Sequence, residues 1–274
     1  MKKIIFVDQK SLLLRSVVIM FLALTFWWIS MFVRDLKEGI ENNAFTLIYP
    51  FLSLLGGFAG LGSARHWGGF QSYLGKAISM LSIGLLSQFF GQFMYAYDIY
   101  IRNIEVPYPS IGDIGYFGSV ICYIIGVSLL AKVSGFKFTL KSLEGKLQAI
   151  VIPLILLTSS YLIFLKGYEF DFSNALKVFL DFGYPLGEAI YVSIAILTLL
   201  MCRNILGGIM KKPIFFLIFA LIYQYFSDFT FLYQANAGTW YVGGVNDYLY
   251  FSSYFLMTIG LVFFGHSYKR IKEA

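Results

Sequence analysis

Five acidic side chains fall inside or at the edge of long apolar stretches of the sequence: Asp113, Asp181, Glu188, Asp228 and Asp247. A carboxylate in the hydrocarbon of a membrane costs at least about 2.5–3.5 kcal/mol, so each one needs a partner, a proton or a water-filled cavity. We expect no lysine or arginine within the membrane near them. Each carboxyl group is therefore expected to carry a proton or to await a cationic ligand, ion or proton.

The acidic residues belong to polar stripes that follow helical spacing. Asp181, Tyr184, Glu188 and Tyr191 lie at i, i+3, i+7 and i+10, which puts all four on one face of a helix. Two further stripes have the same character: Gln88, Gln92 and Tyr95, and Gln224, Asp228 and Phe231.

Polar stripes that face lipid are unfavourable, so these faces should point at one another or into a solvated pocket. We predict an acidic, tyrosine-rich cleft open to the outside of the membrane, with Glu188 and Asp228 as its deepest acids. Its tyrosine rings could add cation–π contacts to an amine. The candidate ligand-binding residues are Glu188, Asp228, Asp181, Tyr184, Tyr191, Gln88, Gln92, Gln224, Asp113, Asp247, Tyr116 and Tyr250.

Several of these residues also have a purely structural interpretation. Ser110 and Asp113 fit a helix capping box, and Asp247 could cap the last helix. The glutamines could instead form hydrogen bonds between helices. Trp240 and Tyr241 are typical of an interfacial aromatic belt.

Recognisable catalytic motifs, including H-E-x-x-H, G-x-S-x-G and a Walker A loop, are absent from the sequence. Glu188 with Asp181 or Asp228 could form an acid/base pair of an intramembrane enzyme, but spacing alone does not give their separation. His66 and His266 lack a second ligand spaced nearby. We therefore expect neither a metal nor a cofactor.

Composition identifies the class of protein. Of 274 residues, 58% are hydrophobic, 19% are aromatic and only 13% are charged, with a mean hydropathy of +0.73. Soluble domains have about 25% charged residues, so this chain is an integral membrane protein and not a nucleic-acid-binding domain. Stretches of about 20 apolar residues predict eight spans near residues 11–33, 44–63, 73–99, 110–133, 147–166, 178–202, 213–235 and 246–268.

Charge in the loops predicts the orientation. If the N-terminus is cytoplasmic, sixteen Lys and Arg residues fall on the inner side and five on the outer side. The positive-inside rule then places both termini in the cytoplasm of a multi-pass protein of the plasma membrane. The formal net charge of +6 reflects this orientation.

The sequence also contains an internal duplication. QFFGQF at residues 88–93 matches QYFSDF at 224–229, and IGDIGYF at 111–117 matches VNDYLYF at 245–251. A glycine follows each aspartate by thirteen residues, and a Tyr-Pro pair precedes each glutamine by 39 or 40. We predict an all-α protein of eight transmembrane helices, built as a parallel tandem repeat of two four-helix units, 1–133 and 146–274, joined by a basic cytoplasmic linker at 134–145.

Two details of packing follow from this arrangement. Pro50 and Pro185 occupy matching helices and should kink both. Gly56 and Gly60 form a G-x-x-x-G motif, for which we favour packing within one chain over a dimer face.

Two segments resemble a known family. The segment PYPSIGDIGYF from Pro107 to Phe117 and the segment YPLGE from Tyr184 to Glu188 are similar to the P-x-P-S-x-x-D-x-x-Y and Y-P-x-G-D segments of multi-span membrane input modules. Those modules precede GGDEF/EAL or histidine-kinase domains in bacterial signalling proteins. The resemblance implies a membrane sensor with Asp113, Tyr116, Tyr184, Pro185 and Glu188 as signature positions, Glu188 standing where an aspartate is more usual. The chain ends at Ala274, so an output domain is expected on a separate cytoplasmic or membrane signalling protein.

Three functions remain open from the sequence. The first is a stand-alone receptor-like module that binds a small polar or cationic ligand in the outer cleft. The second is a proton- or cation-coupled transporter of a small solute, and the third is a structural or assembly subunit. The expected partners are membrane lipid, a small-molecule ligand and a separate signalling protein, and nucleic acid is excluded.

Overall fold

The computed structural model describes residues 2–102, 104, 108–134, 142–166, 172–201 and 210–273. Its long helices are α1 (Lys2–Val33), α2 (Ile40–Ile48), α3 (Phe51–His66), α4 (Tyr73–Tyr100), α5 (Gly112–Val133), α7 (Leu143–Ser160), α8 (Ala175–Met201), α9 (Lys211–Asn236) and α10 (Val245–Glu273). Three short elements accompany them: η1 (Gly69–Gln71), η2 (Tyr161–Leu165) and η3 (Phe172–Asn174).

Eight spans in the described part of the chain are long and apolar enough to cross a membrane, and α2 with α3 forms one of them. The protein is therefore a multi-pass membrane protein in its fold class, as the composition indicates. Most of the predicted linker, residues 135–141, lies outside the described residues.

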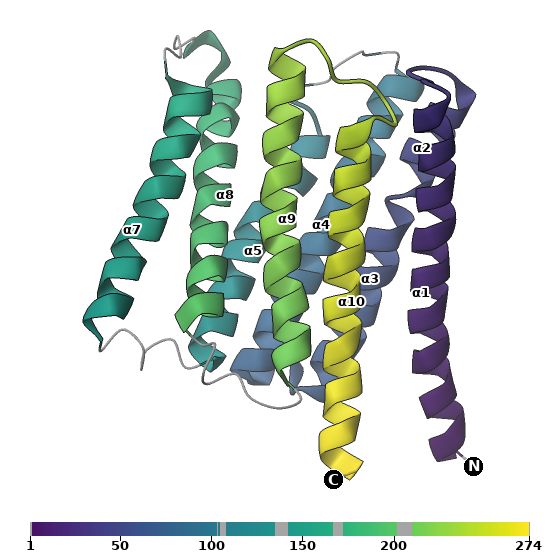
Figure 1. Cartoon of the computed structure of the whole chain (residues 1–274), viewed down its shortest axis with the longest axis vertical. Helices are drawn as coiled ribbons and strands as arrows, with labels where there is room; N and C mark the ends of the chain where they lie inside the picture. The colour runs from purple at the N-terminus through teal and green to yellow at the C-terminus, as the bar shows by residue number, and fades with distance from the viewer. Residues whose placement is uncertain are drawn as a thin grey trace.

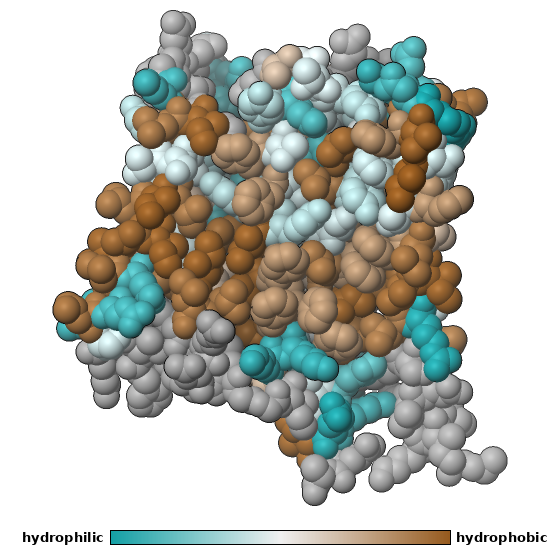
Figure 2. All heavy atoms as spheres, viewed as in Figure 1, coloured by the Kyte–Doolittle hydropathy of each residue, from teal (hydrophilic) through white to brown (hydrophobic). Residues whose placement is uncertain are grey.

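The surface of the bundle is apolar between its two ends. Figure 2 shows hydrophobic residues over the middle of the molecule and hydrophilic residues gathered mainly toward the top and bottom. α7 is the most exposed helix of the set, with Leu147, Ile150 and Leu154 all more than half exposed. Such a surface matches the hydrocarbon of a bilayer, in which helices satisfy their own backbone groups.

Local sequence explains where several helices begin. The Ser72 hydroxyl accepts a hydrogen bond from the Gly75 N–H at 2.9 Å and caps α4, and Ser142 does the same for Gly145 at 3.0 Å in α7. These N-caps satisfy N–H groups that have no partner within the helix.

The two Tyr-Pro pairs behave differently. The span of α2 and α3 is interrupted at Tyr49-Pro50, whereas α8 continues through Pro185. The two prolines, for which matching kinks were predicted, therefore differ in their effect on the helix. Pro50 lies between the end of α2 and the beginning of α3, whereas Pro185 lies inside the single helix α8.

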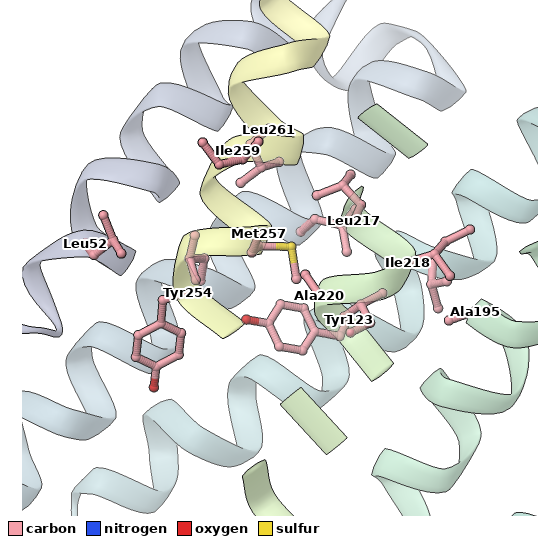
Figure 3. Packing of buried hydrophobic residues seen from close by; sticks show 14 of the residues in the cluster. Leu52, Tyr123, Ala195, Leu217, Ile218, Ala220, Tyr254, Met257, Ile259 and Leu261 are labelled. Atoms are coloured by element: carbon pink, nitrogen blue, oxygen red, sulfur yellow. The ribbon is translucent and has the colours of Figure 1, made fainter. Parts of the chain in front are cut away.

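Six helices contact one another in a closed order: α3, α4, α5, α8, α9, α10 and again α3. α1 packs on α10 and α7 packs on α8, outside this ring. α1 begins and α10 ends at the same end of the bundle (Figure 1). The ring is filled by a continuous hydrophobic cluster to which α5, α9 and α10 contribute Tyr123, Ala220 and Met257 (Figure 3).

Small residues permit the closest helix contacts in the ring. A Cβ atom added at Gly56 would overlap Thr258 Oγ1 of α10, and one added at Gly60 would overlap Ser82 Oγ of α4. The G-x-x-x-G motif of α3 therefore packs against helices of its own chain. Close backbone approach of this kind supplies the van der Waals contact that holds helices together in lipid.

Candidate ligand-binding cavity

A cavity of about 480 Å³ lies among helices of the ring, toward the end of the bundle opposite the termini. Its wall comes from the ends of α4 and α9, the beginnings of α5, α8 and α10, and the loops that join them. These elements bring together side chains that are far apart in sequence.

Ten of the twelve residues predicted from the sequence line this cavity: Gln88, Gln92, Asp113, Tyr116, Asp181, Tyr184, Glu188, Asp228, Asp247 and Tyr250. Tyr191 and Gln224 do not. Tyr191 is fully buried against Tyr123, with ring centroids 5.8 Å apart, because the last turn of its stripe passes below the cavity floor. Gln224 is buried behind Asp228 and accepts a hydrogen bond from the Ser253 hydroxyl at 2.7 Å.

Glu188 of α8 and Asp228 of α9 both line the cavity, and their carboxyl groups lie close enough to interact with each other. Asp228 Oδ1 also accepts hydrogen bonds from the Tyr250 hydroxyl at 2.8 Å and from Gln224 Nε2 at 3.1 Å. Two carboxylates offer only acceptors, so a hydrogen bond between them requires a proton. The pair can therefore hold one proton, or exchange it for a cation.

Asp113 and Asp247 each use their two oxygens in the same way. Asp113 Oδ2 accepts from the Ser110 N–H at 2.7 Å, and Asp247 Oδ2 accepts from the Gly243 N–H at 2.6 Å. These bonds agree with the capping interpretation. The other oxygens accept from tyrosines, Tyr184 to Asp113 Oδ1 at 2.7 Å and Tyr49 to Asp247 Oδ1 at 3.0 Å. Each of the two aspartates therefore caps its own helix and also joins it to a tyrosine that is distant in the sequence.

A third tyrosine hydrogen bond also lies on the cavity wall. The Tyr108 hydroxyl donates to Asp181 Oδ1 at 2.6 Å and connects the segment before α5 to the beginning of α8. Both residues line the cavity.

The glutamines connect helices, as the structural interpretation expects. Gln88 Nε2 donates to Ser119 Oγ at 2.7 Å, and its Oε1 accepts from the Tyr254 hydroxyl at 3.0 Å. Gln92 also hydrogen-bonds Tyr254. Gln88 and Gln92 remain on the cavity wall, so bonding between helices does not remove them from the site.

The structure adds wall residues that sequence reasoning did not select as ligand-binding. Lys177 lines the cavity from the first turn of α8, which begins at Ala175 and not at residue 178. Lys177 is exposed near the start of the helix, so the expectation of no lysine or arginine within the membrane near the acids stays a prediction. The helix starts earlier than the apolar run that was used to predict it.

Aromatic residues that are not among the candidate ligand-binding residues form another part of the wall. Trp240 lines the cavity from the loop between α9 and α10 and contacts Tyr95 and Phe231, with ring centroids 6.3 and 6.0 Å apart. The sequence favours a membrane-interface role for Trp240. Tyr95 and Phe231 lie on the predicted polar stripes, and that spacing was the signal that could have identified them.

No group of three or more His, Cys, Asp or Glu side chains in the described part of the chain could hold a metal ion. No family model matches the sequence, and no match was found among curated proteins or solved structures.

Proposed function

We propose that this protein is a membrane receptor or sensor-like module that binds a small polar or cationic ligand in an outward-facing acidic, tyrosine-rich cleft. The observation that carries the proposal is the cavity of about 480 Å³ on which five carboxyl groups from four helices converge. Pockets of about 300–1,000 Å³ with a few convergent polar groups are typical of small-molecule sites.

The charge of the wall favours a cation. Lys177 is the single Lys or Arg among the described lining residues, against the five carboxyl groups of Asp113, Asp181, Glu188, Asp228 and Asp247. Even with one proton on the Glu188–Asp228 pair, negative groups outnumber positive ones. Tyrosine faces next to carboxylates add further attraction for an amine.

The proposal includes a tandem repeat, and paired contacts support it. A Cβ atom on Gly126 would lie 2.8 Å from Leu81 Cγ, and one on Gly260 would lie 2.7 Å from Leu217 Cδ2. Leu81 and Leu217 precede the two matched glutamines by the same interval, and the two glycines follow the matched aspartates by the same interval. Equal packing at matched positions is the expected result of duplication.

Contacts between the proposed units are reciprocal. Tyr184 of the second unit binds Asp113 of the first, and Tyr49 of the first binds Asp247 of the second. Both aspartates line the cavity. A ligand that changes these contacts would move the two units relative to each other. We propose that this movement transmits ligand binding to a separate signalling partner. The resemblance to bacterial input modules supports this sensing role.

Binding is tested on the full chain in lipid nanodiscs by thermal unfolding with tetramethylammonium, ethanolamine and glycerol. We expect at least one probe to raise the unfolding temperature, and Asp228→Asn to reduce that rise. Glu144→Gln on α7 is the matched control, because Glu144 is exposed and outside the cavity lining. Lack of stabilisation by all three probes would contradict the receptor proposal and favour a structural subunit.

A transporter is the second candidate, and the Glu188–Asp228 pair is the observation that favours it. Two interacting carboxyl groups on a cavity wall can bind one proton between them and exchange it for a cation. A flux assay in proteoliposomes with an imposed pH gradient separates the functions. Uptake of a probe that Glu188→Gln abolishes would establish transport, whereas saturable binding without uptake would support sensing.

A further inference from the structure

The cavity contains a set of acceptors that suits an ammonium group. Asn246 is 1% exposed and lines the cavity, and its Nδ2 donates to Ser227 O at 2.7 Å. Its Oδ1 has no hydrogen-bond partner in the part of the chain that the structure describes. Ser227 precedes Asp228, and Asn246 lies one helical turn before Tyr250, which binds Asp228. Asn246 therefore lies on the cavity wall beside the turns of α9 and α10 that carry Asp228 and Tyr250.

An ammonium group has three N–H donors. Glu188, Asp228 and Asn246 supply three acceptors on α8, α9 and α10. A buried amide oxygen without a partner is uncommon in proteins and calls for a donor. A primary amine meets this requirement, and it replaces the proton that the two carboxyl groups otherwise share.

Next to this acidic set is an aromatic wall. Phe231 follows Asp228 by one turn on α9, so both side chains lie on the same helix face. Its ring contacts Trp240, Trp240 contacts Tyr95, and Tyr95 contacts Tyr116 at 6.5 Å between centroids. All four rings line the cavity. The wall therefore offers a continuous aromatic surface that begins beside the carboxyl pair.

Part of the remaining lining is apolar, including Val120, Leu180 and Leu232. A polar group of a ligand that lies against these apolar side chains would lack a hydrogen bond, which is unfavourable. An apolar body with a single charged end fits this division of the wall.

Resting on the proposed function, we infer that the cavity binds arylalkylamines. The ammonium group lies on Glu188, Asp228 and Asn246, and the aromatic ring packs against Phe231, Trp240 and Tyr95. The short alkyl link spans the single helical turn between Asp228 and Phe231.

Three probes that differ in one feature each test this inference. Isothermal titration calorimetry on the full chain in phosphatidylcholine nanodiscs compares phenethylamine with 2-phenylethanol, which lacks the charge, and with n-butylamine, which lacks the ring. Empty nanodiscs correct for partition of the probes into lipid. We expect phenethylamine to bind about tenfold or more tightly than either of the others, since a desolvated cation and a buried ring each contribute on this scale.

Two substitutions assign the binding to the two parts of the wall. Glu188→Gln should weaken the binding of phenethylamine much more than the binding of 2-phenylethanol. The control Glu144→Gln should change neither affinity. Phe231→Leu should weaken the binding of phenethylamine and leave the affinity for n-butylamine unchanged. Phe215→Leu is its matched control, because Phe215 is on the same helix but is exposed and outside the cavity lining. Thermal unfolding without probe verifies that each variant is folded.

The outcomes separate this inference from the proposed function. Equal affinity for n-butylamine and phenethylamine would reject the arylalkylamine class and leave a cation-binding cavity in place. Equal affinity for 2-phenylethanol and phenethylamine would reject the ammonium assignment. Failure of all three probes while ethanolamine or tetramethylammonium stabilises the protein would overturn the inference alone.

Discussion

In the proposed repeat, the two units differ in charge at the positions of the carboxyl pair. Asp228 occupies the position of Gln92, and Glu188 follows Tyr184-Pro185 at the position where Ser53 follows Tyr49-Pro50. Gln92 hydrogen-bonds Tyr254, and the Ser53 hydroxyl donates to Pro50 O at 2.6 Å. The two corresponding positions of the first unit are thus neutral and bonded within the protein, whereas the second unit carries a carboxyl pair there; the first unit's own cavity carboxyl group is Asp113. Under the proposed function, the cation site therefore belongs to the second unit.

The largest expected effect comes from removing the carboxyl pair of the second unit. The double variant Glu188→Gln with Asp228→Asn should weaken phenethylamine binding at least about thirtyfold, because the ligand cation loses its buried partners. The equivalent change in the first unit, Ser53→Ala with Gln92→Leu, should alter affinity by less than about threefold. Titration calorimetry in nanodiscs measures both. Similar losses for the two variants would show that the two units do not differ in function.

The next largest effect concerns helix packing, and the two units should lose the same amount of stability. Gly126→Ala and Gly260→Ala each force a Cβ atom against a leucine side chain at under 3 Å. Each should lower the free energy of unfolding by about 1–3 kcal/mol, by overpacking a close helix contact. Gly62→Ala on α3 is the control, because nothing lies within 4 Å of its added Cβ. Chemical denaturation in mixed micelles gives the values, and a clear difference between the two glycines would argue against the repeat.

The reciprocal tyrosines give a smaller effect that should also be equal. Tyr184→Phe and Tyr49→Phe each remove one hydrogen bond to a cavity aspartate. Each loss should cost about 1–2 kcal/mol, since a bond to a charged acceptor is stronger than a neutral one. Tyr233→Phe, on a tyrosine that is 63% exposed, is the control. Thermal unfolding monitored by circular dichroism tests whether the unfolding temperatures of both variants fall by the same amount.

The smallest expected effect is a gain of binding at a neutral position of the first unit. Gln92→Asp places a carboxyl group at the position equivalent to Asp228. It should improve binding of the diamine putrescine by about threefold to tenfold, because a second ammonium then finds a partner. Affinity for n-butylamine should change less. An unchanged ratio of the two affinities would show that Gln92 does not correspond to Asp228 within the cavity.

Much of the fold and of the cavity could be predicted from the sequence. Eight apolar stretches require eight spans, because a helix of that length is the stable way to cross hydrocarbon. Polar side chains at i, i+3 and i+7 mark one face of a helix, and such faces avoid lipid. That argument selected six of the ten predicted residues that line the cavity, including Glu188 and Asp228.

The misses have a local cause. Lys177 was missed because α8 extends beyond its apolar run into a charged first turn. Trp240 was assigned to the membrane interface because residues of a connecting loop have no periodicity that shows which way they face. Tyr191 was included because helical spacing gives a face but not the depth at which the cavity ends.

The sequence by itself determined the membrane class, the number of spans and which helix faces are polar, since these depend on the composition and period of short segments. Only the tertiary structure decided that Tyr184 binds Asp113, that Tyr49 binds Asp247 and that Glu188 meets Asp228. Those partners are on different helices. Which side chains meet across a helix contact depends on the depth and rotation of each helix in the ring, and close packing at residues such as Gly56 and Gly260 sets both.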